Sequence, residues 1–112
     1  MAEVKYIVPP VDIYENDEKY LILMDMPGVN KDKIDITVED DKLTVTGKVF
    51  EIDKEWEPIS TEFSLSDYKR EFNLGRKVNT EKITANYENG ILRLELEKSE
   101  LAKPRKIEVK AG

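Results

Sequence analysis

The residue types that most often carry catalysis are scarce in this chain of 112 residues, which contains no His and no Cys. The commonest general base, the commonest zinc ligand and the thiol nucleophile are therefore absent. Asp40 and Asp41 are adjacent carboxylates, and Asp25 is a third candidate acid. Nothing around them supplies a nucleophile or a base, and Asp40-Asp41 is better explained as a hairpin turn. We therefore expect no enzymatic activity, no cofactor and no metal site.

The other chemistry that the sequence suggests is apolar contact by its last segment, which ends KPRKIEVKAG. Ile107 and Val109 are two residues apart, so in an extended chain both side chains lie on one side. Burial of one such side chain stabilises a contact by ~1.5–3 kcal/mol, and weak contacts repeated around an assembly add up. The segment could dock onto another copy, or it could form a last strand of its own domain.

Composition limits the possible partners. The chain has 24 acidic and 18 basic residues, a net charge of −6, which argues against nucleic acid and anionic membranes as partners. Its start, MAEVKYIVPP, does not resemble a secretory signal, and no apolar run approaches the ~20 residues that span a bilayer. We expect one cytoplasmic domain with a modest core.

Apolar residues alternate with polar ones through most of the chain, which predicts an all-β fold. The expected strands cover residues 11–14, 19–26, 33–40, 42–49, 68–74, 83–88 and 91–97. Asn89-Gly90 is a strong hairpin signal. No long helix is expected, although residues 30–33 and 79–82 could each form one helical turn.

An internal repeat relates two parts of the sequence. VNKDKIDITVEDDKL (29–43) and VNTEKITANYENGIL (78–92) match position by position at an offset of 49 residues. Each reads as a short turn followed by a hairpin. We interpret them as equivalent hairpins that pack face to face in a β-sandwich.

A long connection, residues 50–67, separates the two hairpins. Such connections usually run ~4–6 residues. This one contains large apolar residues that need a covering surface: Phe50, Ile52, Trp56, Ile59, Phe63 and Leu65. It could fold over its own sandwich or reach a second chain, and composition favours neither.

Four motifs in order resemble the small heat shock proteins of the alpha-crystallin or Hsp20 family. MDMPGVNKDKIDI (24–36) is similar to the family's strand, Pro-Gly and strand signature, and YKREF (68–72) to its aromatic-x-Arg-x-Phe strand. ANYENGILRLELEK (85–98) resembles the closing A-x-x-x-x-G-x-L-x-L signature. KPRKIEV (103–109) resembles the C-terminal extension with its Ile-x-Ile/Val motif.

The resemblance implies an immunoglobulin-like β-sandwich, the alpha-crystallin domain, over residues 9–98. A short N-terminal arm (1–8) precedes it and a C-terminal extension (99–112) follows it. It also implies an ATP-independent holdase that binds partly unfolded client proteins. The long loop would exchange a strand within a homodimer, and the interface is expected to include Trp56, Ile59, Glu62, Phe63 and Arg70. Ile107 and Val109 would dock into a groove of a neighbouring dimer, for which we expect Ile36, Val38, Ala85 and Tyr87, and so could build a higher oligomer.

The sequence departs from that family pattern in its loop, and its N-terminal arm (1–8) is short. Arginines that are common near residues 60–63 are absent, and Ser66 stands where a Gly is usual. The alternative function is a co-chaperone module of the p23/CS type, which binds a specific folded partner. Those modules typically lack both the long loop and the tail motif, which favours the holdase.

Overall fold

The computed structural model describes residues 6–49, 55, 59 and 67–111. Among these residues the regular structure is nearly all strand, with one short 3₁₀ helix, η1 (Gly75–Lys77). The strands are β1 (Tyr6–Ile7), β2 (Val11–Glu15), β3 (Lys19–Asp25), β4 (Val29–Glu39), β5 (Lys42–Val49), β6 (Asp67–Asn73), β7 (Val78–Glu88) and β8 (Ile91–Lys98). In this part of the chain no helix is long and apolar enough to cross a membrane.

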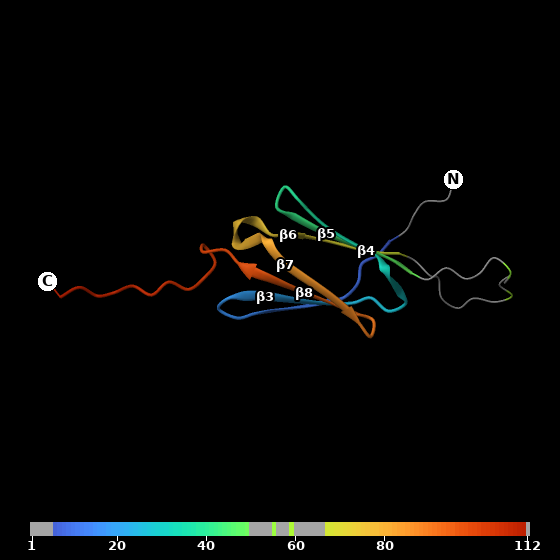
Figure 1. Cartoon of the computed structure of the whole chain (residues 1–112), viewed down its shortest axis with the longest axis horizontal. Helices are drawn as coiled ribbons and strands as arrows, with labels where there is room; N and C mark the ends of the chain where they lie inside the picture. Colours follow the sequence, from blue (N-terminus) through green and yellow to red (C-terminus); the bar gives the residue numbers. More distant parts are fainter. Residues whose placement is uncertain (1–5, 50–54, 56–58, 60–66, 112) are drawn as a thin grey trace.

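The strands form two four-stranded sheets that enclose one core (Figure 1). One sheet has the order β1-β6-β5-β4 and the other the order β2-β3-β8-β7. Neighbouring strands are antiparallel except β1 and β6, which are parallel. The predicted immunoglobulin-like β-sandwich is therefore confirmed, and β4 and β7 each end a sheet.

The core follows from the alternation of side chains along each strand, which places every second residue in the space between the sheets. Leu92, Leu94 and Leu96 of β8 are at most 1% exposed, and Met24 and Met26 are fully buried. The other buried apolar residues of the core come from both sheets and their connections: Ile22, Val29, Leu43, Val45 and Leu74.

The repeat in the sequence is a repeat in the structure. Glu39 pairs with Lys42 and Ile34 with Gly47 in the β4–β5 hairpin. The residues 49 positions later pair in the same way in the β7–β8 hairpin, where Glu88 faces Ile91 and Ile83 faces Leu96. Both ladders are also irregular at the matching place, after Val29 and after Val78. The predicted equivalence of the two hairpins is confirmed, with one hairpin in each sheet.

The prediction of helical turns at 30–33 and 79–82 is wrong, because both segments lie inside the irregular first halves of β4 and β7. Asn30 accepts a hydrogen bond from the Asp32 amide at 3.1 Å, and Asn79 accepts one from the Glu81 amide at 3.1 Å. A side-chain oxygen thus satisfies a backbone N–H that leaves the ladder. The strands begin four or five residues earlier than expected, since a bulge interrupts the apolar alternation without ending the strand.

Two backbone hydrogen bonds tie each hairpin turn to a segment that crosses from one sheet to the other, residues 26–28 for one turn and residues 74–77 for the other. The Met26 amide donates to the Gly90 carbonyl at 2.8 Å, and the Leu74 amide donates to the Asp41 carbonyl at 2.8 Å. Asp40 and Asp41 have positive φ angles of 52° and 61°, so this pair is a hairpin turn, as predicted. Each hairpin turn is therefore fixed to the segment that leads into the next edge strand.

Candidate docking edge

The residues expected to form a groove lie on the two strands that end the sheets. Ile36 and Val38 are on β4, and Ala85 and Tyr87 are on β7. Within the described residues, neither strand has a partner on its outer side. Ile36 and Tyr87 are half-buried against the core, whereas Val38 is 39% exposed and Ala85 is exposed. We call the inward-facing residues of these strands the β4/β7 edge: Ile34, Ile36, Val38, Ile83, Ala85 and Tyr87.

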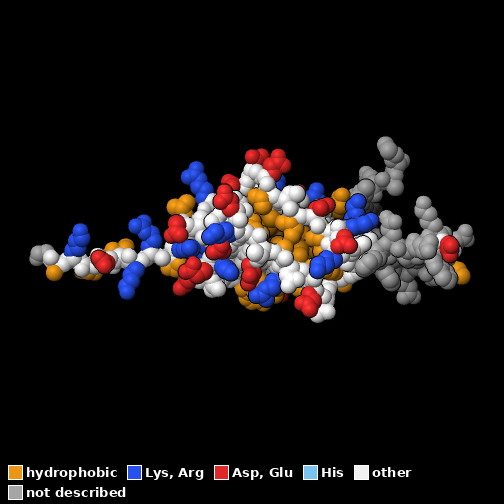
Figure 2. Space-filling view, viewed as in Figure 1, with side chains coloured by type: hydrophobic (Ala, Val, Ile, Leu, Met, Phe, Trp, Pro, Cys, Tyr) orange, Lys and Arg blue, Asp and Glu red, His pale blue; other side chains and the backbone are white. Residues whose placement is uncertain are grey.

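Figure 2 shows what this edge presents to the outside. A continuous hydrophobic patch lies in the middle of the face, between the β4–β5 hairpin above it and β7 below it (Figures 1 and 2). Charged side chains surround the patch (Figure 2). An apolar surface with a charged rim is typical of a site that binds another polypeptide.

Two residues of the edge, Ile34 and Ile83, were missed by sequence reasoning. Both pack against the core and remain partly exposed. The repeat contains the signal that could have found them, because they occupy equivalent positions 49 residues apart. Both residues lie just after the bulge, within the predicted strands 33–40 and 83–88, so alternation also places them on the same face as the expected groove residues.

Tyrosine hydroxyls fix the end of the edge where β4 begins. The Tyr87 hydroxyl donates to the Met26 carbonyl at 2.7 Å, and the Tyr68 hydroxyl donates to the Pro27 carbonyl at 3.2 Å. Burial, with a smaller effect from the nearby Asp25 carboxylate, raises the pKa of Tyr68 above its ordinary value of 10.0. The hydrogen bond of its hydroxyl to Met26 makes the aromatic ring of Tyr87 a fixed part of the edge.

The tail lies apart from this edge. Ile107 is 84% exposed and Val109 is 96% exposed. Figure 1 shows the segment after β8 extending away from the sandwich, and residues 104–111 form no strand. In this structure Ile107 and Val109 are therefore not a last strand of their own domain.

The start of the tail is held firmly. The Ser99 amide donates to the Lys77 carbonyl at 2.9 Å, and its hydroxyl donates to the Arg76 carbonyl. The Lys103 ammonium lies 3.5 Å from a carboxylate oxygen of Glu18 and 3.2 Å from one of Glu100. The segment that carries Ile107 and Val109, which we call the two pegs, therefore begins at residues that are bound to the domain.

An ion pair closes the same end of the sandwich. The Lys98 side chain is only 7% exposed, and its ammonium lies 2.8 Å from a Glu15 carboxylate oxygen and 5.0 Å from the centre of the Tyr20 ring. The hydrogen bond from Lys98 and its charge lower the pKa of Glu15. The hydrogen bond to Glu15 likewise raises the pKa of Lys98. The pair joins the end of β8 to the end of β2.

Arg70 lies on the opposite side of the sandwich from the β4/β7 edge. It pairs in register with Val45, which is 1% exposed, so its side chain starts from the inward face of β6. The guanidinium donates to the Pro9 carbonyl at 3.1 Å and lies 5.4 Å from the centre of the Phe72 ring. No carboxylate of the described residues pairs with it.

The rest of the expected dimer interface is not described. Trp56, Glu62 and Phe63 lie outside the described residues, and Ile59 is fully exposed. The assignment of these residues and of Arg70 to a dimer interface stays a prediction. So does the assignment of the groove residues to tail docking, for which the structure supplies the apolar edge and the free pegs.

Comparison with protein families gives one match over most of the chain. Residues 12–110 match the Hsp20/alpha crystallin family. A probable 15 kDa heat shock protein of Leptospira interrogans is 38% identical over 110 residues, which cover 96% of this chain and 82% of that protein. The 18 kDa antigen 2 of Mycobacterium avium is 38% identical over 91% of this chain and 74% of its own.

Solved structures agree with this match. Heat shock protein 16.0 of Schizosaccharomyces pombe has a TM-score of 0.71 at 26% identity, over 93% of this chain and 99% of that one. A small heat-shock protein of Xylella fastidiosa, described as having a distinct high order structure, has a TM-score of 0.74 over 96% of this chain and 100% of its own. At 24% identity the second likeness concerns the fold alone.

Proposed function

Because this chain belongs to the Hsp20/alpha crystallin family of small heat shock proteins, whose role is that of chaperones, we propose that it is an ATP-independent holdase. It would bind partly unfolded proteins and suppress their aggregation. The observation that carries the proposal is the partly exposed apolar β4/β7 edge, which belongs to a sandwich with one packed core. An unfolding client exposes apolar segments that such an edge can cover.

Extended segments suit this edge particularly well. The outer backbone groups of β4 and β7 have no strand partner in the described part of the chain, so a bound segment could add main-chain hydrogen bonds. Its alternate side chains would then enter the space between the strands. Main-chain recognition is insensitive to sequence, which is what a protein with many clients needs. The net charge of −6 would keep the complexes soluble.

The tail is proposed to bind the same edge of a neighbouring molecule. Ile107 and Val109 are free in this chain and have the spacing of alternate residues on one side of a strand. Residues 103–107, beyond the last contact of the tail with its own domain, can extend ~13 Å at ~3.3 Å per residue, which carries both side chains clear of the sandwich. Tails and clients would then compete for one surface, and tail release would uncover it.

The homodimer is proposed to form by strand exchange through residues 50–67. The outer side of β2, at the opposite edge of its sheet from β7, lacks a partner in the described residues. Ile13 and Tyr14 on that strand are each 56% exposed. A strand from a second copy would cover them and bring carboxylates toward Arg70. A sedimentation series over concentration tests this, and a monomer throughout would contradict it.

The cytoplasmic location likewise remains a proposal.

Light scattering of a heat-labile client, with and without this protein, tests the holdase function. We expect reduced scattering that does not depend on ATP. Val38→Glu should weaken protection because it places a charge in the apolar edge, whereas Thr37→Glu on the outward face is the matched control. No protection at equal mass would overturn the proposal in favour of a module that binds one folded partner.

A further inference from the structure

The two ends of the β4/β7 edge are equivalent by the repeat but differ in charge. The β4–β5 turn stands at one end and the β7–β8 turn at the other, because the two hairpins point in opposite directions (Figure 1). Glu39 and Glu88, 49 residues apart, precede the two turns at matching positions, and both are exposed. Each end therefore has at least one carboxylate.

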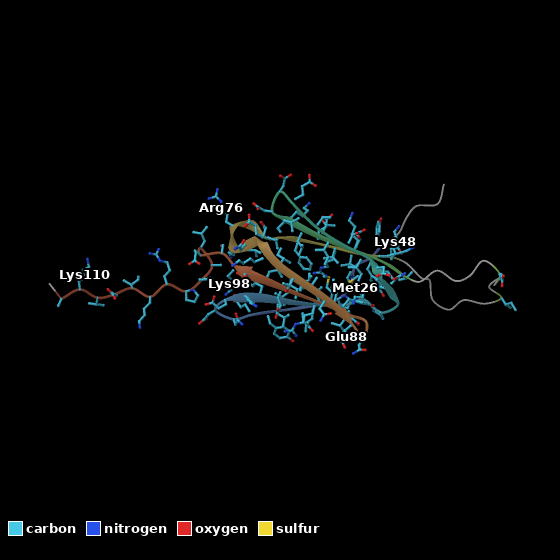
Figure 3. The ribbon with its side chains drawn as sticks, viewed as in Figure 1. Met26, Lys48, Arg76, Glu88, Lys98 and Lys110 are labelled. Carbon is cyan, nitrogen blue, oxygen red and sulfur yellow. The ribbon has the colours of Figure 1, made fainter. Side chains whose placement is uncertain are left out.

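The end at the β4–β5 turn is the more acidic. Asp40 and Asp41 follow Glu39 directly, all three are exposed, and none forms an ion pair within the described residues. Lys42 beside them is 3.5 Å from a Glu71 carboxylate oxygen and so is already paired. Of the two cations of η1, Arg76 projects away from the sandwich (Figure 3), and Lys77 lies close enough to Glu15 of β2 to act on its charge. Three carboxylates thus remain available at this end.

The other end is close to neutral. Tyr87 and Gly90 bond to Met26, which ties the end of β7 to the segment just before β4. The first half of β4, which carries Lys31 and Lys33, therefore lies near Glu88. No ion pair engages these two lysines in the part of the chain that the structure describes. They offset the charges of Glu88 and of Asp32. Asp25, which pairs in register with Ile91 beside the same turn, leaves this end with about one negative charge, against three at the other end.

The tail has a matching asymmetry. Arg105 and Lys106 precede the two pegs, whereas Lys110 alone follows them. Five residues of extended chain, such as 106–110, span ~13 Å from the first Cα atom to the last, about the same as the stretch from Ile36 of β4 to Asp40 in the turn after it. When Ile107 and Val109 lie over the middle of the β4/β7 edge, the cations that precede them reach one end of the edge and Lys110 reaches the other.

We propose that charge sets the direction of the docked tail: Arg105 and Lys106 of a second copy lie at the β4–β5 turn, and Lys110 lies at the β7–β8 turn. The tail then runs antiparallel to β4 and parallel to β7. This inference rests on the proposed docking of the tail and adds its direction. It also defines the segments that the edge prefers, which are apolar pairs preceded by basic residues.

The absence of Cys from the chain allows a direct test by site-specific cross-linking. One copy carries Lys42→Cys or Ile91→Cys, which are equivalent strand positions beside the two turns. The other copy carries Pro104→Cys or Ala111→Cys, which leave Arg105, Lys106 and Lys110 in place. After a short bismaleimide treatment of mixed chains, mass spectrometry measures the four cross-linked products. Circular dichroism first confirms that each variant keeps its β structure.

We expect the products 42–104 and 91–111 to exceed 42–111 and 91–104 by about 2- to 30-fold, because two exposed ion pairs discriminate between the directions. Removing Arg105 and Lys106 together (both to Ala) should abolish the preference, and Lys110→Ala should preserve it. Equal or reversed yields overturn the proposed direction while leaving tail docking intact. No product from any combination overturns docking and direction together. Client protection measured on the same samples shows separately whether the holdase function fails.

Discussion

The two hairpins of the sandwich share one register but not one set of residues. β4–β5 and β7–β8 pair their strands identically at an offset of 49 residues, including the bulge. Yet Gly47 occupies the position of Leu96, Val49 that of Lys98, and Val38 that of Tyr87. The shared positions specify the same hairpin in each sheet. The three differences lie at different places: Gly47 lies against the segment between β3 and β4, Lys98 lies at the start of the tail, and Val38 and Tyr87 lie on the candidate docking edge.

The Gly47 and Leu96 pair shows how one difference arises. A Cβ at Gly47 would lie 2.4 Å from the Met26 methyl carbon and 3.1 Å from a Val29 methyl carbon. The segment between β3 and β4 therefore fills the space that Leu96 fills with its own side chain in the other hairpin. The same core position is filled locally in one hairpin and by a distant segment in the other.

Truncating the large member of this pair should have the largest effect. Leu96 is 1% exposed, so Leu96→Ala removes buried contacts and leaves a cavity. We expect a loss of ~2–5 kcal/mol in the free energy of unfolding. Denaturant titration measures it. Ile91→Ala, at an exposed position of the same strand, is the control and should change little.

Enlarging the small member should also destabilise, but less. Gly47→Ala forces the Met26 side chain to move within a closed core, at a cost of ~1–3 kcal/mol. Combining it with Met26→Ala should cost less than the two single changes added together, because the second change makes room for the first. Strict additivity of the two losses would show that Met26 does not fill the place of a leucine.

Lys98 occupies the position that Val49 has in the other hairpin, and its ion pair with Glu15 predicts that the stability of the fold depends on pH. Lys98→Met should lower the melting temperature at pH 7 by less than Leu96→Ala does. Lys98 lowers the pKa of Glu15, so the stabilisation is present above the ordinary carboxyl value of 4.5 and is lost as pH falls through the lowered one. The difference in melting temperature should therefore shrink in acid. Lys82→Met, which removes an exposed pair at 4.0 Å, is the control and should show almost no difference at any pH.

The smallest effect on stability should come from the tail. Ile107→Ala with Val109→Ala alters two exposed side chains outside the sandwich, so unfolding should change by less than ~0.5 kcal/mol. Species larger than a dimer should disappear in sedimentation velocity. Marked destabilisation would mean that these residues pack on their own domain in solution.

Much of the fold was predictable because alternation and turn residues act locally. Asn89-Gly90 and the leucines of β8 specify a hairpin without help from the rest of the chain. The first halves of β4 and β7 were not predictable, since a bulge breaks the alternation and only pairing across the sheet reveals a strand. The parallel pairing of β1 with β6 is likewise invisible in a two-residue segment.

The candidate site divides in the same way. The pegs at 107 and 109 and the four groove residues could be named from spacing and resemblance. That Lys98 is nearly buried against Glu15 could not, because the pattern alone places a lysine at the end of a strand in solvent. Long-range pairing of this kind depends on which strand ends meet.

The central claim is that the β4/β7 edge receives Ile107 and Val109 from another copy. A peptide of residues 103–112, titrated into the isotope-labelled Ile107→Ala, Val109→Ala chain, tests it by backbone amide chemical shifts. The claim predicts saturable shifts at residues 34–38 and 83–87, and none with the peptide in which both pegs are Ala. Shifts confined to β2 and β6, or none at millimolar-scale excess, would contradict it.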